Sequence, residues 1–198
     1  IFMATRNSVV KKTNLNLVHK KYKSGIKAIR LDDDDKLVGT SITDGDNDIL
    51  LSSYSGKLIR FHESKVRPMG RTARGVKGIT LKDNMKVISL MIGDASKTIL
   101  CLSENGFGKR TSVSSYKVQN RGGSGIKTAK ITPKTGKVVA SFIVNAKLEE
   151  EDLIIISKKG QIIRLPIKSV SVLGRATQGV KLMRFKEKDD KVASVTFI

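Results

Sequence analysis

The chain has 198 residues, and its 38 Lys and Arg against 18 Asp and Glu give a formal net charge of +20. A charge of this size favours a polyanionic partner, nucleic acid first and an anionic membrane surface second. The single cysteine, Cys101, excludes an internal disulfide and is typical of a reducing cytosol. No apolar run approaches the ~20 residues of a membrane span, so we expect a cytoplasmic protein that does not cross a membrane.

Residues 1–47 form the first of four similar stretches. Short β-branched and apolar runs between turn residues predict strands at 1–5, 9–13, 26–31 and 36–42. Four aspartates before Lys36 resemble a protease-cleavage tag, but a lysine begins the same strand in every repeat, so we interpret them as a native turn. The chain begins with a strand and not with a signal peptide, so we expect it to be a piece of a longer protein.

The same order of strands recurs in residues 48–95, 96–147 and 148–198. Each repeat contains a glycine that follows a basic loop and precedes an apolar strand; these are Gly25, Gly75, Gly125 and Gly179, separated by 50, 50 and 54 residues. Ser-Gly, Asn-Gly and Lys-Gly pairs between β-branched runs predict hairpins. The expected strands are 49–53, 57–61, 79–81, 86–92, 98–103, 107–111, 126–131, 137–144, 152–157, 161–165, 180–185 and 191–198.

Four strands in each repeat indicate blades, because supersecondary units of this size bury their apolar faces against their neighbours. We predict an all-β fold, a propeller-like array of four-stranded antiparallel blades that forms a single domain over residues 1–198. A β-sandwich or barrel is the alternative, but it does not account for the even four-fold repetition.

Basic residues recur at two places in the repeat. The end of the second strand carries a cation in every repeat, at Lys12, Arg60, Arg110 and Arg164. The basic loop carries the second set, which is Lys20, Lys21, Lys23, Arg67, Arg71, Arg74, Lys117, Arg121, Lys168 and Arg175. Lys11 and Lys109 adjoin the first set, and the third repeat has ten Lys and Arg against one acidic residue.

We predict that these cations are exposed on one outer rim and contact the phosphates of DNA. Arginine suits this role because its planar fork donates two hydrogen bonds at once. A duplex that follows a rounded belt of cations must bend, and phosphate contacts offset the cost without reading bases. The pattern therefore favours non-specific wrapping of duplex DNA.

Several motifs resemble those of one family over the whole chain. They include Gly75-Val76-Lys77-Gly78-Ile79, Gly108-Lys109-Arg110-Thr111 and Thr177-Gln178-Gly179-Val180. The chain resembles the C-terminal domain of the bacterial DNA gyrase A subunit. The resemblance implies a β-pinwheel, a six-bladed propeller variant that wraps DNA on its outer rim, of which this chain would be the last four blades. The family's signature box is best matched by the segment from Gln119 to Gly125, where Asn120 and Ser124 replace two cations.

The resemblance also implies partners and cofactors. The partners would be double-stranded DNA, the remainder of the gyrase A subunit and the gyrase B subunit, in a heterotetramer of the bacterial cytoplasm that associates with the nucleoid. This domain would need no cofactor, because ATP and magnesium act elsewhere in the holoenzyme. It would be a non-catalytic part of an ATP-dependent type II topoisomerase.

No catalytic or metal site is predicted from the residues. His19 and His62 stand apart from any triad or metal spacing, no phosphate-binding Gly-x-x-x-x-Gly-Lys motif is present, and Cys101 lies in an apolar strand that predicts a core position. Two other functions remain open: the equivalent domain of topoisomerase IV, and a propeller scaffold for proteins. The scaffold is the poorer hypothesis, because the chain has no Trp and so lacks the Trp-Asp signature of WD repeats.

Overall fold

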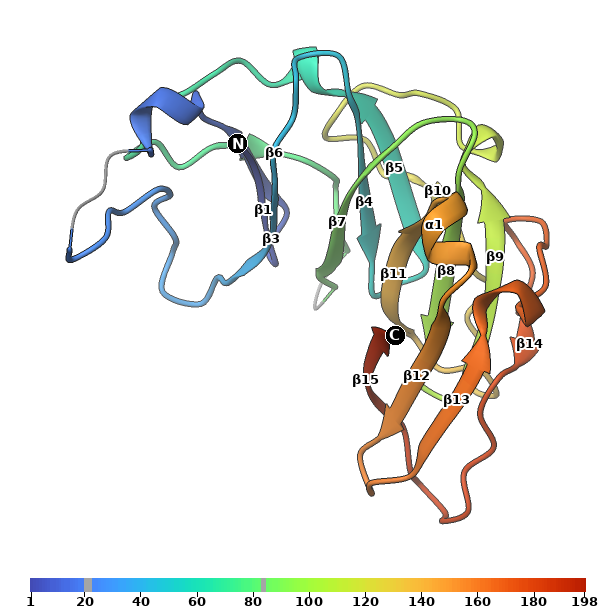
Figure 1. Cartoon of the computed structure of the whole chain (residues 1–198). Helices are drawn as coiled ribbons and strands as arrows, with labels where there is room; N and C mark the ends of the chain where they lie inside the picture. Colours follow the sequence, from blue (N-terminus) through green and yellow to red (C-terminus); the bar gives the residue numbers. More distant parts are fainter. Residues whose placement is uncertain (20–22, 83–84) are drawn as a thin grey trace.

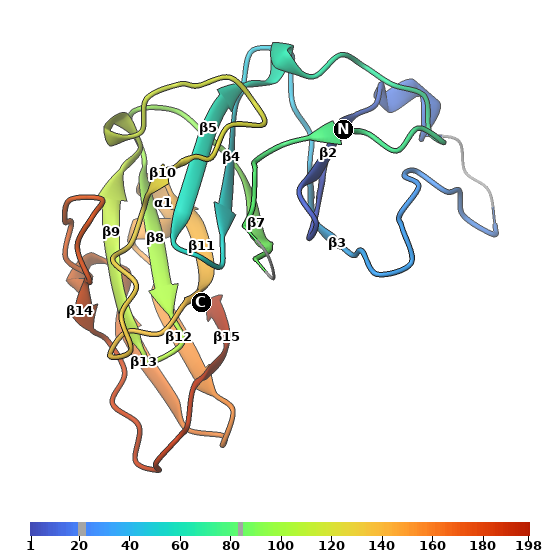
Figure 2. The same ribbon diagram turned by 180° about the vertical axis from the view of Figure 1, so that it is seen from behind.

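The computed structural model describes residues 1–19, 23–82 and 85–198 as four antiparallel sheets that follow one another along an open arc (Figures 1 and 2). The all-β fold class and the propeller-like array are confirmed. The innermost strands of successive sheets contact each other, β3 with β7, β7 with β11 and β11 with β15. None of the helices in the described residues is long and apolar enough to span a membrane.

Each sheet contains one hairpin, which is central in the first three sheets. The strands in chain order are β1 Phe2–Thr5, β2 Val9–Lys12, β3 Leu37–Ser41, β4 Asp48–Ser53, β5 Lys57–His62, β6 Val76–Lys77, β7 Val87–Gly93, β8 Thr98–Ser103, β9 Phe107–Ser112, β10 Ile126–Lys127, β11 Val138–Val144, β12 Asp152–Ser157, β13 Ile162–Pro166, β14 Val180–Lys181 and β15 Val192–Phe197. Short 3₁₀ turns follow the hairpins at η1 Leu15–Leu17, η2 Glu63–Lys65, η3 Val113–Ser115 and η4 Ile167–Ser169, and α1 is one turn at Ala146–Glu149.

The outermost strand of each of the first three sheets comes from the next repeat. The sheet orders are β3-β1-β2-β6, β10-β5-β4-β7 and β11-β8-β9-β14, so β6, β10 and β14 lie beside the hairpin of the preceding repeat. The expectation that the third strand of each repeat completes its own blade was therefore wrong. β6 lies just before the expected 79–81, which forms no strand, and β10 and β14 are only the first two residues of the expected 126–131 and 180–185. The pairing is short, two residues in each case, but it ties every repeat to the sheet before it.

The glycine that marks each repeat makes this exchange possible. Gly75, Gly125 and Gly179 have positive φ angles of 108°, 65° and 81°, which residues with a side chain rarely adopt. A Cβ atom there would lie 2.5, 2.8 and 2.6 Å from backbone oxygens of β2, β5 and β9, respectively. The glycines thus serve the close approach of one repeat to the sheet of the previous one.

The fourth sheet has three strands, in the order β13-β12-β15. Its outer strand β13 is exposed, and Ile162 on it is 63% exposed, whereas the equivalent Val10 and Leu58 are fully buried. At the other end of the arc, Ile26 and Lys27 lie at the position of the exchanged strands but pair with no sheet, although a strand was expected at 26–31.

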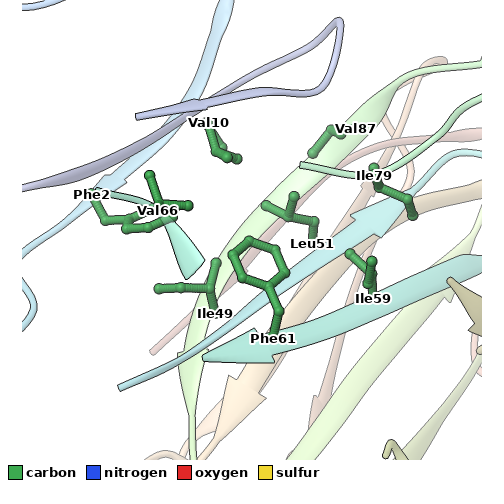
Figure 3. Close-up of a cluster of buried hydrophobic side chains, with 10 residues drawn as sticks. Phe2, Val10, Ile49, Leu51, Ile59, Phe61, Val66, Ile79 and Val87 are labelled. Atoms are coloured by element: carbon green, nitrogen blue, oxygen red, sulfur yellow. The ribbon is translucent and has the colours of Figure 1, made fainter. Parts of the chain in front are cut away.

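The apolar core lies between the sheets. One cluster joins Phe2 and Val10 of the first sheet to Ile49, Phe61 and further residues of the second (Figure 3). Two other clusters join the second sheet to the third and the third to the fourth. Because a sheet between two neighbours buries both of its faces, β4 shows five consecutive buried residues in place of simple alternation.

Candidate nucleic-acid interface

In the first three repeats, the cation at the end of the second strand lies at the boundary between two sheets. The side chains of Lys12, Arg60 and Arg110 are only 16%, 11% and 8% exposed. Each residue forms a parallel bridge with the following repeat, to Pro68, Val118 and Val172, respectively. The prediction that this column is an exposed outer belt is therefore wrong for these three positions.

Arg60 and Arg110 clasp the 3₁₀ turn of the next repeat. The guanidinium of Arg60 donates to the backbone oxygens of Val113 and Tyr116, both at 3.2 Å, and pairs with the Asp48 carboxylate at 2.6 Å. Arg110 donates through Nε to the backbone oxygen of Val170 at 2.9 Å and pairs with Glu149. A strand-end arginine suits this task because one rigid fork reaches several acceptors at once.

Lys12 has the same role with a different partner. Its ammonium contacts the backbone oxygen of Glu63 at 3.2 Å and the carboxylate of Glu63 at 3.3 Å. Burial alone would raise the pKa of Glu63, but hydrogen bonds from Thr43, the Asn47 amide, Lys12 and the Gly45 amide lower it below its ordinary value. Glu63 was missed in the sequence, because an isolated glutamate after a strand carries no sign of burial.

Arg164 is the exception in this column. Its side chain is 65% exposed and pairs with Asp152 at 2.5 Å. The fourth sheet has no following repeat in the described residues, so Arg164 has no 3₁₀ turn to clasp.

Lys11 and Lys109 are fully buried, with exposures of 0% and 1%. The Lys109 ammonium donates to the backbone oxygens of Gly174 and Arg175 at 2.6 Å and to Thr177 Oγ1 at 3.0 Å. The Lys11 ammonium donates to the backbone oxygens of Ala28 at 2.8 Å and Arg71 at 2.5 Å. The expectation that these two lysines touch phosphate directly conflicts with this burial.

The loop cations lie mainly at the surface. The exposed ones are Lys23, Arg67, Arg74, Lys117 and Lys168, and the partly exposed ones are Arg71, Arg121 and Arg175. Two of the exposed residues have acidic partners, Arg74 with Asp32 and Lys168 with Glu150. Lys20 and Lys21 lie outside the described residues.

A second recurring column is exposed and was not among the predicted contacts. Lys77, Lys127 and Lys181 are the last residues of the exchanged strands β6, β10 and β14, and Lys27 holds the same place in the first repeat; all four are exposed. The sequence contained the signal, because Gly-Ile-Lys or Gly-Val-Lys occurs in every repeat. The prediction used the glycine of this motif and not its lysine.

Two loop arginines contact the exchanged strand that carries the lysine of the preceding repeat. Arg121 donates to the backbone oxygen of Lys77 at 3.3 Å, and Arg175 donates to that of Lys127 at 3.4 Å. The Gly122 amide donates to the backbone oxygen of Gly78 at 2.6 Å, so the loop of one repeat contacts the exchanged strand before it. The result is a basic rim, which we define as Lys27, Lys77, Lys127 and Lys181 with Arg71, Arg121 and Arg175.

Within the described ranges, no group of three or more His, Cys, Asp or Glu residues is placed to hold a metal ion. His62 contacts the exposed Asp46 at 3.1 Å. Cys101 is buried, as predicted, and burial raises the pKa of its thiol.

Comparisons with known proteins agree with the resemblance read from the motifs. A family model described as "DNA gyrase C-terminal domain, beta-propeller" matches residues 1–44, 47–94, 97–145 and 151–198. The DNA gyrase A subunit of Clostridium acetobutylicum is 48% identical over 198 residues, which cover 100% of this chain and 23% of that protein. The DNA gyrase A subunit of Staphylococcus epidermidis is 44% identical over 186 residues, which cover 93% of this chain and 20% of that protein. The chain thus spans less than a quarter of the length of these relatives.

Two solved structures share the fold. The C-terminal domain of DNA topoisomerase IV superposes with a TM-score of 0.89 at 23% identity, covering 100% of this chain and 61% of that one. A DNA gyrase A C-terminal domain superposes with a TM-score of 0.83 at 25% identity, covering 99% of this chain and 64% of that one. The topoisomerase IV likeness concerns the fold alone, whereas the family match and the relatives at 44% and 48% identity concern sequence as well. The chain belongs to the DNA gyrase C-terminal β-propeller domain family.

Proposed function

We propose that this chain binds and bends duplex DNA, without reading its sequence, as the DNA-wrapping module of a gyrase A subunit. The observation that carries the proposal is the exposed lysine that ends each exchanged strand, at Lys77, Lys127 and Lys181, and recurs in the same Gly-x-Lys motif at Lys27. A scattered solubilising surface would not place one cation at the same structural position three times and in the same motif four times.

The rim suits phosphates better than bases. Lysine and arginine neutralise phosphates whatever the sequence, and such contacts position a duplex without specifying it. The sheets follow an arc, so a duplex held along their outer edges must curve with them (Figure 1). Bending ~20–30 bp by 40–90° costs on the order of 1–6 kcal/mol, which repeated phosphate contacts along the arc offset.

The wider assembly is part of the same proposal. The relatives are DNA gyrase A subunits, so the partners would be the rest of that subunit and gyrase B in a bacterial cytoplasmic heterotetramer associated with the nucleoid. In this assembly the chain would be non-catalytic, and strand cleavage, ATP and magnesium would belong to other parts of the enzyme.

The test compares two double variants in binding to random duplexes of AT-rich and GC-rich composition. Lys77→Ala with Lys127→Ala removes two rim cations, so the slope of log K against log salt should flatten by about two units, equally for both compositions. Lys86→Ala with Lys137→Ala is the matched control, because these exposed lysines precede the innermost strands β7 and β11. Equal losses of DNA affinity and salt slope in both double variants would show that the charge acts as a diffuse field. That result would refute phosphate contact by the rim lysines.

A further inference from the structure

Two of the buried charges lie directly beneath the basic rim. Lys11 and Lys109 occupy the same position of the second strand in the first and third repeats, one residue before the inter-sheet cation. Each is essentially inaccessible to solvent, and each directs its ammonium at the loop that the next repeat lays along the sheet. An ammonium in the interior requires several hydrogen-bond acceptors to offset the loss of water.

For each lysine, one of these acceptors is the backbone oxygen of a loop arginine. Lys11 holds the backbone oxygen of Arg71, and Lys109 holds that of Arg175. These arginines are equivalent, since each lies four residues before the glycine of its repeat. The same lysine-to-arginine contact is therefore built twice, at two separate places along the arc.

The second repeat provides a natural contrast. Its equivalent residue is Ile59, which lies in the apolar cluster between the first two sheets (Figure 3). Above it, the loop places Gly123, where a Cβ atom would lie 3.7 Å from the Ile59 side chain. A loop of this kind can thus rest on an apolar side chain, so an ammonium is not required by the fold at this position.

We propose that Lys11 and Lys109 are positioning residues for DNA binding, which draw the backbone oxygens of Arg71 and Arg175 inward and so hold those arginine side chains toward the phosphates. This inference rests on the proposed function. The inward carbonyls would otherwise present partial negative charge to the DNA. Arg175 stays in place against the ring of Tyr116, with its guanidinium 5.9 Å from the ring centroid.

The charge state of Lys109 should then be linked to DNA. The ionisable groups around it are Cys101 on β8, Arg175 in the loop, and Tyr116 and Lys130 from the third repeat. Burial lowers the pKa of Lys109 to about 8, while burial raises the pKa of Tyr116 to about 12 and that of Cys101 above its ordinary value. With a pKa of about 8, Lys109 changes its charge between pH 7 and 9, and bound DNA should raise this pKa by reciprocal linkage.

A double-variant cycle tests the proposal with the whole chain and a random duplex. Arg175→Ala should flatten the salt slope by about 0.9 unit, because one phosphate contact is lost. Lys109→Ile, which copies Ile59, should flatten it by a similar amount, and the two changes together by no more than about 0.9 unit. If Lys109 touched phosphate itself, the changes would add to about 1.8 units, which would overturn the proposal.

Two further measurements separate positioning from a purely structural role. Trypsin should cut after Arg175 faster in Lys109→Ile than in the wild type, with cutting after Arg121 unchanged as the internal control. The NMR titration of the Lys109 side chain should show a higher pKa when DNA is bound, and an unchanged pKa would contradict the proposal.

The remaining outcomes are also decisive. Failure of the wild-type chain to bind any duplex would refute the proposed function. If the wild type binds and Lys109→Ile binds with the same affinity and salt slope, only this inference would be refuted. If Lys109→Ile does not fold, Lys11→Ile with trypsin cutting after Arg71 replaces it. Unfolding of both variants would mean that the lysines serve the fold alone, and would overturn the proposal.

Discussion

The Lys12 ammonium lies 3.3 Å from the Glu63 carboxylate, across the boundary between the first and second sheets. The Glu63 side chain is 1% exposed and also accepts hydrogen bonds from Thr43 and from the amides of Gly45 and Asn47. A cation expected to face DNA is thus one donor to a buried acid that ties a strand, a loop and a turn together. Each position of this column has its own acidic partner, and the predictions below follow from that arrangement.

Glu63→Gln should destabilise the chain by roughly 3–5 kcal/mol, the range for breaking a buried ion pair, as measured by urea unfolding at pH 7. The pKa of Glu63 is lowered in the folded state, so its contribution is present above its ordinary pKa of 4.5 and is lost as the pH falls through the folded value. The wild type should therefore lose stability below pH 4.5 more steeply than Glu63→Gln. Parallel pH profiles for the two proteins would contradict this assignment.

Arg110→Ala should destabilise the chain by about 2–4 kcal/mol, because it leaves Val170 and neighbouring backbone acceptors without a donor inside the interface. Arg164→Ala is the matched control: the equivalent side chain is 65% exposed, so its loss should cost under ~1 kcal/mol. Denaturant unfolding of both variants would measure these two changes in the free energy of unfolding. A larger cost at Arg164 than at Arg110 would mean that the inter-sheet clasp is not the source of stability.

Lys109→Met should change how stability depends on pH. Burial lowers the pKa of Lys109 from 10.5 to about 8, so between these values the unfolded chain binds a proton that the folded chain does not. The Lys109 contribution to the free energy of unfolding therefore rises with pH across this window and is constant below it. Chemical denaturation from pH 7 to 10.5 should show a smaller rise in Lys109→Met than in the wild type, because Lys11 and Lys181, whose pKa values are also lowered, still contribute.

Leu58→Ala should cost about 2–4 kcal/mol, because Leu58 is fully buried under the exchanged strand β10. Ile162→Ala at the equivalent position of the fourth sheet should cost under ~1 kcal/mol, since Ile162 is 63% exposed. Thermal or urea unfolding of the two variants provides the comparison. Similar costs would show that β13 is covered in solution, contrary to the open edge in the structure.

The local part of the fold was predictable from the sequence. The hairpins β4-β5, β8-β9 and β12-β13 were expected within one residue of their observed bounds, because turn pairs and β-branched runs act over short distances. The repeat itself, and with it the array of blades, followed from the spacing of Gly25, Gly75, Gly125 and Gly179.

The tertiary structure alone decided which sheet each short strand completes and which cations are free. Val76 and Lys77 belong by sequence to the second repeat, yet they pair with β2 of the first, because the local pattern does not specify a distant partner. Likewise, the local sequence does not distinguish Lys11, Arg110 and Lys77, and each has the pattern of a surface cation. Packing against the next repeat buries Lys11 and Arg110 against backbone carbonyls and leaves Lys77 in solvent. The sequence determined the repeat and its charge, and inter-sheet packing determined which of those charges remain available to a partner.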